Sequence, residues 1–372
     1  MRLLIAALAF VLLYMVQNKI YKKYWDKKLD AELRFSRDYM ECGETAELIE
    51  TVTNNKLLPL PTLNLKFSVD KSLDFNGKEN SSISDYYNKN EIFSILGNTK
   101  AVRKLSFKAL KRGIFEIKNS SVLVKDFFMT ETFAKQIKND DLLYVFPKKI
   151  STERFCILSN NIIGEIESQR SLIFDELIFT GIREYQTWDS YRSINWKQSA
   201  KANSLMVNMH GYTIDREVIV MLNLDTDMMI ETDKILEEAI SLTSSLTLML
   251  LKKNAKVSFV TNGKNKDGKK LVTIEAGSDI SHQISIDREL SEISGSEGKD
   301  FFLSLIDKEI KNPDYSKLYI IISPYHKADL IEKLDKLKAT GCGVIFTALY
   351  YDEFPYRPDR DYIKCWEVGF NV

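Results

Sequence analysis

Apolar and polar positions follow three different patterns along the chain. An uncharged apolar run, LLIAALAFVLLYMV, occupies residues 3–16 and is followed by lysines interleaved with aromatic residues. Between about residues 30 and 147, apolar residues alternate with polar ones or form short stretches. From residue 216 onward, solid apolar runs alternate with amphipathic segments. These patterns predict an apolar helix, then a domain of β-strands, then a domain in which strands and helices alternate.

The first segment, residues 1–25, has the features of a membrane anchor. Its apolar run is shorter than the roughly 20 residues that usually span a bilayer, so a signal-peptide core or a buried helix are alternatives. A cleaved signal has its positive charge before the core and small residues after it, whereas here Arg2 precedes the core and five lysines follow it. A continuous helix over residues 1–25 would be about 37 Å long, which is enough to cross. Because positive residues beside a span tend to stay in the cytoplasm, we expect a single-pass helix in the cell membrane and a cytoplasmic soluble part.

The second segment, residues 26–150, has the pattern of an antiparallel β-sandwich. Turn-forming residues such as Pro59, Pro61 and Asn76-Gly77 separate its apolar stretches. The polar stretch 70–100 is interpreted as a long loop or an elaborated hairpin. The predicted strands cover residues 46–52, 63–69, 102–110, 113–117, 121–124 and 142–145.

The last segment, residues 211–372, predicts an open, doubly wound α/β domain. Its first apolar run, EVIVMLNL at residues 217–224, is typical of a parallel strand that is buried on both faces. Further strands are expected at residues 256–261, 271–275, 318–323 and 343–349, and helices at 232–253, 282–293, 301–311 and 326–340. The whole chain is therefore expected to be an α+β multidomain protein.

Composition narrows the classes of partner. Lysine plus arginine and aspartate plus glutamate both number 52, so the formal net charge is zero, and the positive excess of a dedicated nucleic-acid binder is absent. Four dispersed cysteines (Cys42, Cys156, Cys342 and Cys365) form neither a disulfide framework nor a zinc motif, which agrees with a reducing compartment.

Residues 151–210 are interpreted as a linker region that carries a dense polar and aromatic motif, GIREYQTWDSYRSINWKQSAK at residues 181–201. This motif resembles the signature of the domain of unknown function 58 family, roughly G-x-R-x-Y-x-x-G-D-x-x-R-x-I-N-W-x-x-S-A. Trp188 replaces the glycine before the signature aspartate, and the chain has one apparent span where two are common. The residues that match the signature are Gly181, Arg183, Tyr185, Asp189, Arg192, Asn195, Trp196 and Ser199.

The resemblance implies both a fold and a role. Members of the family are membrane-anchored, and their last domain is similar to the von Willebrand factor A fold. They are typically encoded beside MoxR-type AAA+ ATPases and are thought to act with them in assembling or maturing protein complexes. The expected function is therefore a membrane-anchored, non-enzymatic scaffold or adaptor with a MoxR-type ATPase as its protein partner.

From the residues themselves, the motif has three interpretations. Its cationic and aromatic side chains are typical of a protein interface. Alternatively, Arg183, Asp189 and Arg192 form a buried ion-pair network, with Trp196 packed between the two domains. A catalytic role lacks a recognisable nucleophile and base, and no GxSxG or HExxH motif is present elsewhere, so the chain is not expected to be an enzyme.

A degenerate metal site is the second candidate. Von Willebrand A domains hold magnesium with a D-x-S-x-S motif after the first strand, and the corresponding loop here offers Asn223, Asp225 and Asp227. The chain would then be a metal-dependent receptor for an acidic peptide. The other interpretation is a polar strand end without metal, in which case the protein has no cofactor.

Two further features are interpreted as structural. The stretch 263–270 resembles a phosphate loop, but Lys270 replaces the hydroxyl residue and a strand follows it. His210, His282 and His326 share no spacing with one another or with the cysteines.

Overall fold

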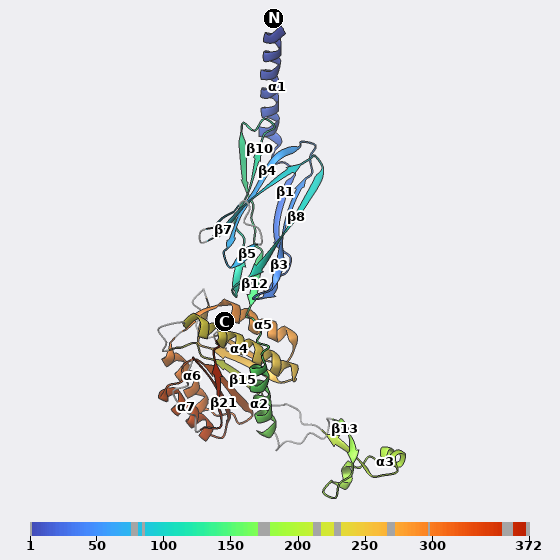
Figure 1. Cartoon of the computed structure of the whole chain (residues 1–372), viewed down its shortest axis with the longest axis vertical. Coiled ribbons are helices and arrows are strands. Elements are labelled where there is room, and N and C mark those ends of the chain that lie inside the picture. Colours follow the sequence, from blue (N-terminus) through green and yellow to red (C-terminus); the bar gives the residue numbers. More distant parts are fainter. Residues whose placement is uncertain are drawn as a thin grey trace. The chain divides into compact units, whose positions relative to one another are not determined.

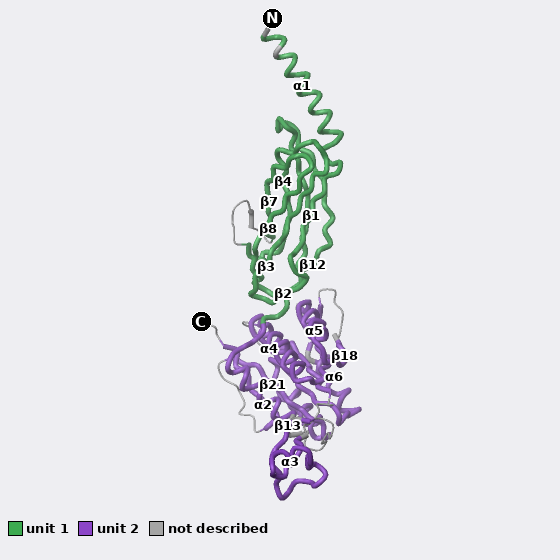
Figure 2. The backbone as a smooth tube through the Cα atoms, turned by 90° about the vertical axis from the view of Figure 1, so that its right-hand side faces the viewer, with its two compact units in different colours: residues 1–148 green, residues 149–372 purple. Residues whose placement is uncertain are grey.

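The computed structural model describes residues 2–75, 81–83, 86–169, 179–210, 217–226, 232–265, 272–296, 298–351 and 360–369. The chain divides into two compact units, residues 1–148 and 149–372 (Figure 2). Each unit has its own hydrophobic core.

Unit 1 begins with the apolar helix α1 (Arg2–Tyr24) (Figure 1). This helix is long and apolar enough to cross a membrane. The large apolar side chains of its first four turns are largely exposed; for example, 71% of Leu8 and 63% of Leu12 are exposed. The expected apolar helix is thus present at the expected position.

The rest of unit 1 contains two main sheets. In spatial order, the first contains β1 (Leu29–Phe35), β3 (Thr45–Asn54), β8 (Thr99–Ala109) and β5 (Leu73–Phe75); the second contains β11 (Thr132–Gln136), β10 (Lys118–Lys125), β4 (Leu60–Asp70), β7 (Tyr86–Ile95) and β6 (Ser81–Ile83). All neighbours within these sheets are antiparallel. A third sheet contains β2 (Tyr39–Glu41), β12 (Leu142–Phe146) and β9 (Gly113–Glu116). One core joins buried residues of both main sheets, such as Leu48 of β3 and Leu65 of β4, which confirms a β-sandwich.

The stretch 70–100 departs from the simple loop that was one of its two interpretations. It contains the short strands β5 and β6 and the ten-residue strand β7. Every second residue of β7 is buried, but two of the buried ones are Lys89 and Glu91. Because charged residues occupy part of the buried face, the sequence does not show the alternation that marks the other strands.

These charges belong to a group of ionisable side chains inside the sandwich. Glu91 pairs with Arg103 of β8, and its Oε1 lies 3.7 Å from Nζ of Lys89. Glu50 of β3 is fully buried, and neither of its carboxyl oxygens accepts a hydrogen bond from a described residue. Burial, helped by the charge of Glu91 and opposed by Arg103 and Lys89, raises the pKa of Glu50 to about 8.

Unit 2 contains one six-stranded sheet. Its order is β18 (Val272–Gly277), β16 (Lys256–Thr261), β15 (Glu217–Leu222), β20 (Lys317–Ser323), β21 (Gly343–Tyr350) and β22 (Ile363–Glu367). All neighbours are parallel except β16 and β18, which are antiparallel. A separate pair is formed by β17 (Gly263–Asn265) and β19 (Ile293–Ser296).

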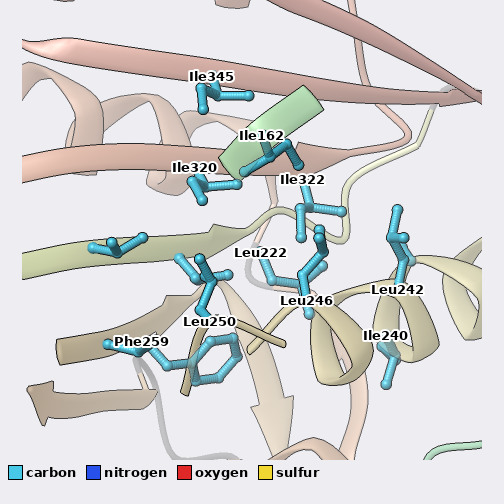
Figure 3. Packing of buried hydrophobic residues seen from close by; sticks show 14 of the residues in the cluster. Ile162, Leu222, Ile240, Leu242, Leu246, Leu250, Phe259, Ile320, Ile322 and Ile345 are labelled. Atoms are coloured by element: carbon cyan, nitrogen blue, oxygen red, sulfur yellow. The ribbon is translucent and has the colours of Figure 1, made fainter. Parts of the chain in front are cut away.

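Helices cover both faces of this sheet. Val218 and Val220 of β15 belong to one core with residues of α2 (Glu153–Gln169), α4 (Thr232–Lys252) and α5 (Ile280–Glu292). Figure 3 shows part of this core, including Leu222 of β15, Ile162 of α2 and Leu246 of α4. Ile219 and Met221 belong to a second core with α6 (Lys299–Lys311) and α7 (Ala328–Ala339). Alternate residues of one strand thus face helices on opposite sides, which confirms the doubly wound arrangement.

Helix α2 corrects the expectation that residues 151–210 form a linker region. Phe155, Leu158, Ile162 and Ile166 are buried in the core of the α/β domain. Their spacing of three or four residues places them on one helical face. The α/β domain therefore begins before the signature motif, and the motif is an insertion between α2 and β15.

A buried ion pair marks the point where the chain enters unit 2. Nζ of Lys149 lies 2.6 Å from Oδ2 of Asp287 on α5, and both side chains also contact the hydroxyl of Ser244 on α4. The side chain of Asp287 is only 4% exposed. This contact fixes the first residue of the unit against two of its helices.

Candidate functional site

The signature motif folds into a small unit of its own, which we call the signature hairpin (residues 179–210). Its strands β13 (Phe179–Glu184) and β14 (Met206–His210) pair antiparallel. A turn, a short 3₁₀ segment (Tyr191–Ser193) and the helix α3 (Trp196–Ala202) connect them (Figure 1). Residues 170–178 and 211–216, on either side, lie outside the described residues.

An ion pair closes the turn of the hairpin. The guanidinium of Arg183 donates two hydrogen bonds to the carboxylate of Asp189, of 2.6 and 2.5 Å. Asp189 also accepts a hydrogen bond from the backbone N–H of Gln186, and its side chain is 10% exposed. The hydrogen bonds from Arg183 and then from Gln186 lower the pKa of Asp189, so the pair stays charged at neutral pH.

Asn195 and Ser199 organise the other half of the hairpin. Asn195 caps α3 by accepting from the N–H of Gln198, and its Nδ2 donates to Oδ1 of Asn208 on β14. The hydroxyl of the buried Ser199 donates to the carbonyl of Asn195 and accepts from the N–H of Met206. These two motif residues therefore attach the short helix to the strand beside it.

The aromatic residues of the motif have a different role. Trp188, Tyr191 and Trp196 are 78%, 75% and 68% exposed. Trp196 therefore is not buried by the described residues, whereas one interpretation of the motif packs it between the two domains. Tyr185 stacks on Tyr191 with a centroid distance of 5.9 Å. The motif thus combines a hydrogen-bonded framework with three large aromatic side chains exposed to solvent.

Arg192 lies outside the ion-pair network that was one interpretation of the motif. Its side chain is exposed and makes no hydrogen bond or ion pair with another described residue, whereas Arg183 and Asp189 pair as expected.

A Cβ atom at Gly181 would meet no described atom within 4 Å, so nothing in the described structure explains the glycine. Trp188 does not adopt the left-handed conformation that favours glycine, so the departure from the family pattern causes no backbone strain.

The second candidate site lies at the carboxyl ends of β15, β16 and β20. Nδ2 of Asn223 donates to the hydroxyl of Ser323, and its Oδ1 accepts from Nδ2 of Asn262 and from the N–H of Asp225. Nδ2 of Asn262 also donates to Oδ2 of Asp225, over 2.9 Å. All four side chains are at most 7% exposed. Asp227 lies outside the described residues.

Most of the described oxygen atoms at these strand ends are already used by other groups of the protein. Magnesium needs oxygen ligands with free lone pairs, usually including carboxylates. Here Oδ1 of Asn223 already accepts two hydrogen bonds, and the hydroxyl of Ser323 accepts from Asn223 and Tyr325 and donates to the carbonyl of Tyr325. Within the described part of the chain, no group of three or more His, Cys, Asp or Glu residues is placed to hold a metal. The described side chains at these strand ends thus form a hydrogen-bond network.

Asn262 was missed by sequence reasoning. It immediately follows the strand at residues 256–261, so the rule that adjacent parallel strands end at one edge of the sheet would have placed it beside Asn223.

Comparison with known proteins supports the family resemblance. The model of the family described as "Protein of unknown function DUF58" matches residues 181–314, which include most of the signature hairpin and the part of the α/β domain from β15 to α6. No curated protein sequence matches this chain at a significant level.

Solved structures show only weak likeness. A CARDB domain from Pyrococcus furiosus is 14% identical, with 32% of this chain and 88% of that chain covered and a TM-score of 0.21. A non-cellulosomal cohesin from Archaeoglobus fulgidus is 12% identical, with 35% and 97% covered and a TM-score of 0.23. The seventh ScaB type I cohesin from Pseudobacteroides cellulosolvens is 12% identical, with 33% and 96% covered and a TM-score of 0.24. TM-scores this low establish neither a shared fold nor a shared function.

Proposed function

We propose that this chain is a membrane-anchored, non-enzymatic adaptor whose signature hairpin binds a protein partner, a MoxR-type AAA+ ATPase. Helix α1 would hold the protein in the cell membrane, and the two domains would lie in the cytoplasm. The observation that carries the proposal is the exposure of three large aromatic side chains on a hairpin whose own framework is held by an ion pair and side-chain hydrogen bonds.

The aromatic residues are of the type that dominates binding energy at protein interfaces. Tryptophan, tyrosine and arginine are enriched among residues whose truncation weakens binding most. Trp188, Tyr191, Trp196 and the exposed Arg192 supply all three residue types. The Arg183–Asp189 pair and the Asn195–Ser199 contacts hold the backbone that carries these residues, and a preformed binding surface loses less entropy on association.

Charge indicates the kind of surface that the hairpin fits. It carries four lysine or arginine residues and two acidic ones, and one of the acidic ones, Asp189, is already neutralised by Arg183. Arg192, Lys197 and Lys201 are exposed. The complementary surface is therefore an acidic patch on a protein. The zero net charge of the whole chain argues against nucleic acid as that partner.

The polar groups of the α/β domain support a binding role. Nε2 of His282 contacts the carbonyl of Val257, and Nδ1 of His326 contacts the carbonyl of Pro324, so both described histidine rings are engaged with backbone. The strand-end network uses its amides and hydroxyl internally.

The strand order of the sheet, with its antiparallel edge strand β18, supports a von Willebrand A-like fold for this domain.

The test is a pull-down of the tagged full-length protein from native membranes, with and without ATP. We expect an AAA+ ATPase to be recovered with the wild type and lost with Trp196→Ala and with Arg192→Ala. Tyr315→Ala, which removes an aromatic residue 59% exposed outside the hairpin, is the matched control and should retain the partner.

Thermal unfolding separates binding from folding. Trp196 and Arg192 are exposed, so both variants should keep the melting temperature of the wild type. Recovery of the ATPase at wild-type levels in both variants would contradict the assignment of the hairpin as the binding site. If no ATPase is recovered in either nucleotide state, the proposed partner is wrong.

A further inference from the structure

The turn between β10 and β11 lies beside the apolar part of helix α1. The ring of Phe128 packs edge-on against Phe10, with a centroid distance of 5.5 Å, and lies 6.0 Å from the ring of Tyr14. The hydroxyl of Tyr14 is 3.3 Å from Oγ1 of Thr130. A turn of the sandwich domain thus reaches a stretch of helix that the sequence marks as apolar.

Polar groups of the helix and of the turn contact each other about one helical turn after Tyr14, from Gln17 onward. Nε2 of Gln17 donates to Oδ2 of Asp126 over 3.1 Å, and Nδ2 of Asn18 donates to Oε1 of Glu131 over 3.1 Å. Nζ of Lys22 lies 2.8 Å from the same oxygen of Glu131. Gln17 and Asn18 are the first strongly polar residues after the apolar run, so both elements change from apolar to polar at the same height.

The apolar tip of the turn is exposed and held in a defined shape. Phe127 and Met129 are each 60% exposed. Met129 has a φ of 58°, a conformation that few residues other than glycine adopt. The buried carboxylate of Asp126 stabilises the turn by accepting from the N–H of Glu131 and the hydroxyl of Thr130. Two large apolar side chains are therefore presented to the surroundings by a strained but well-supported turn.

We propose that this turn, which we call the apolar turn (residues 126–131), inserts into the membrane interface beside α1, with a lipid bilayer as its partner. The proposal rests on the membrane anchoring proposed above and adds a second point of contact to it. Phe10 and Tyr14 precede Gln17 by seven and three residues, which correspond to about 10 and 5 Å along a helix. Phe128 packs against both, so the tip of the turn lies beyond Gln17, on the apolar side of the helix. Its depth beyond Gln17 is then about 5–10 Å, which is typical of interfacial insertion.

Two observations favour lipid over a protein partner. The apolar residues of α1 at the height of the tip, such as Leu12, are themselves mostly exposed, so the turn extends a surface that already needs an apolar environment. Five lysines follow Gln17 and Asn18 along the chain, within residues 19–28, where they can attract anionic headgroups. The lysines are Lys19, Lys22, Lys23, Lys27 and Lys28.

Site-directed spin labelling of the full chain in liposomes of phosphatidylcholine and phosphatidylglycerol tests the proposal. Nitroxide labels are placed by Phe127→Cys and by Met129→Cys after the native cysteines are replaced (Cys42→Ser, Cys156→Ser, Cys342→Ala and Cys365→Ser). Leu8→Cys on α1 is the lipid-exposed control, and Ile92→Cys, at a position 53% exposed on β7, is the water-exposed control. Collisions with oxygen, which concentrates in lipid, are compared with collisions with a water-soluble nickel chelate.

We expect the labels at 127 and 129 to resemble the label at 8 and to favour oxygen over nickel several-fold relative to the label at 92. If the label at 8 favours oxygen but those at 127 and 129 favour nickel, the inserted turn is wrong while the anchor stands. If all of them favour nickel, the anchor and the inserted turn are both wrong. Labels at 127 and 129 that neither reagent reaches would show a protein contact, which also overturns the proposal. Because both side chains are exposed, the labelled variants should keep the melting temperature of the cysteine-free parent.

Discussion

Glu50 offers the sharpest test of the described interior, because its carboxyl group is buried in the sandwich without a hydrogen-bond partner among the described residues. The perturbation is Glu50→Gln, which keeps the size of the side chain and removes its titration. The pKa of Glu50 is raised to about 8 from an ordinary value of 4.5, chiefly by burial and then by the charge of Glu91. In the folded protein this carboxyl group is therefore protonated at neutral pH, whereas in the unfolded chain it is ionised.

The magnitude follows from linkage between protonation and folding. Between pH 4.5 and 8 the folded state holds a proton at Glu50 that the unfolded state lacks, so stability falls as pH rises across this range. Each pH unit corresponds to about 1.4 kcal/mol, so the full effect is on the order of 5 kcal/mol and is complete above pH 8. Below pH 4.5 both states are protonated and the effect is absent.

The assay is urea unfolding of the full chain in detergent at pH 5, 7 and 9. Fluorescence of Trp25, the only tryptophan in unit 1, reports on the sandwich when Trp188, Trp196 and Trp366 are replaced by phenylalanine. We expect the free energy of unfolding of Glu50→Gln, relative to the parent, to rise by a few kcal/mol from pH 5 to pH 9. The buried amide shifts the variant by a pH-independent amount, so only this slope is diagnostic. Glu47 lies on the same strand as Glu50, but its carboxylate is partly exposed and pairs with Lys104 of β8, so Glu47→Gln should show almost no slope. A difference between Glu50→Gln and its parent that is the same at pH 5 and pH 9 would refute the reasoning.

Two further predictions concern the α/β domain. Lys149→Met leaves Asp287 as a buried charge without its cation, so the domain should lose about 3–5 kcal/mol of unfolding free energy in urea titrations. The double variant Lys149→Met with Asp287→Leu should recover most of this loss. A loss below about 1 kcal/mol in the single variant would show that the pair is solvated. Asn262→Ala removes the hydrogen-bond donor to Asn223 and Asp225, so the free energy of unfolding should fall by about 1–3 kcal/mol. Millimolar MgCl₂ should leave the melting temperature of the wild type unchanged, because Oδ1 of Asn223 and Oδ2 of Asp225 already accept hydrogen bonds. A rise in melting temperature with magnesium would instead support the metal-dependent receptor.

The sequence predicted the elements whose burial follows a single rule. Strands such as 217–222 are buried on both faces and appear as solid apolar runs, and helices such as 232–252 show a clear amphipathic pattern. Strand β7 was assigned only to a long loop or hairpin, because Lys89 and Glu91 occupy its buried face. Helix α2 was not predicted, although Phe155, Leu158 and Ile162 have the spacing of one helical face. Strand β22 was not predicted, since its sequence IKCWE has only a weak apolar pattern.

The candidate site was predictable as a set of residues but not as a geometry. The motif identified Arg183 and Asp189 as possible partners, and they do pair. Whether Trp196 is a core residue or a surface residue depends on contacts between segments distant in the sequence, and no local pattern determines these contacts. The same holds at the strand ends, where the hydrogen bonds of Asn223 depend on Asn262 and Ser323 on neighbouring strands.

The signature hairpin has a small interior. Among its residues whose side chains are described, only Ile194, Ser199 and Val207 are buried. A two-stranded ribbon with so little buried surface is marginally stable, so its amide hydrogens should exchange through local opening at a much lower free energy than those of the six-stranded sheet. A bound partner would suppress this opening in proportion to its concentration relative to its dissociation constant. Resistance of this one segment to proteases would then measure how much of the protein is in complex, and any modification that loosens the ribbon would weaken the complex without touching the contact residues.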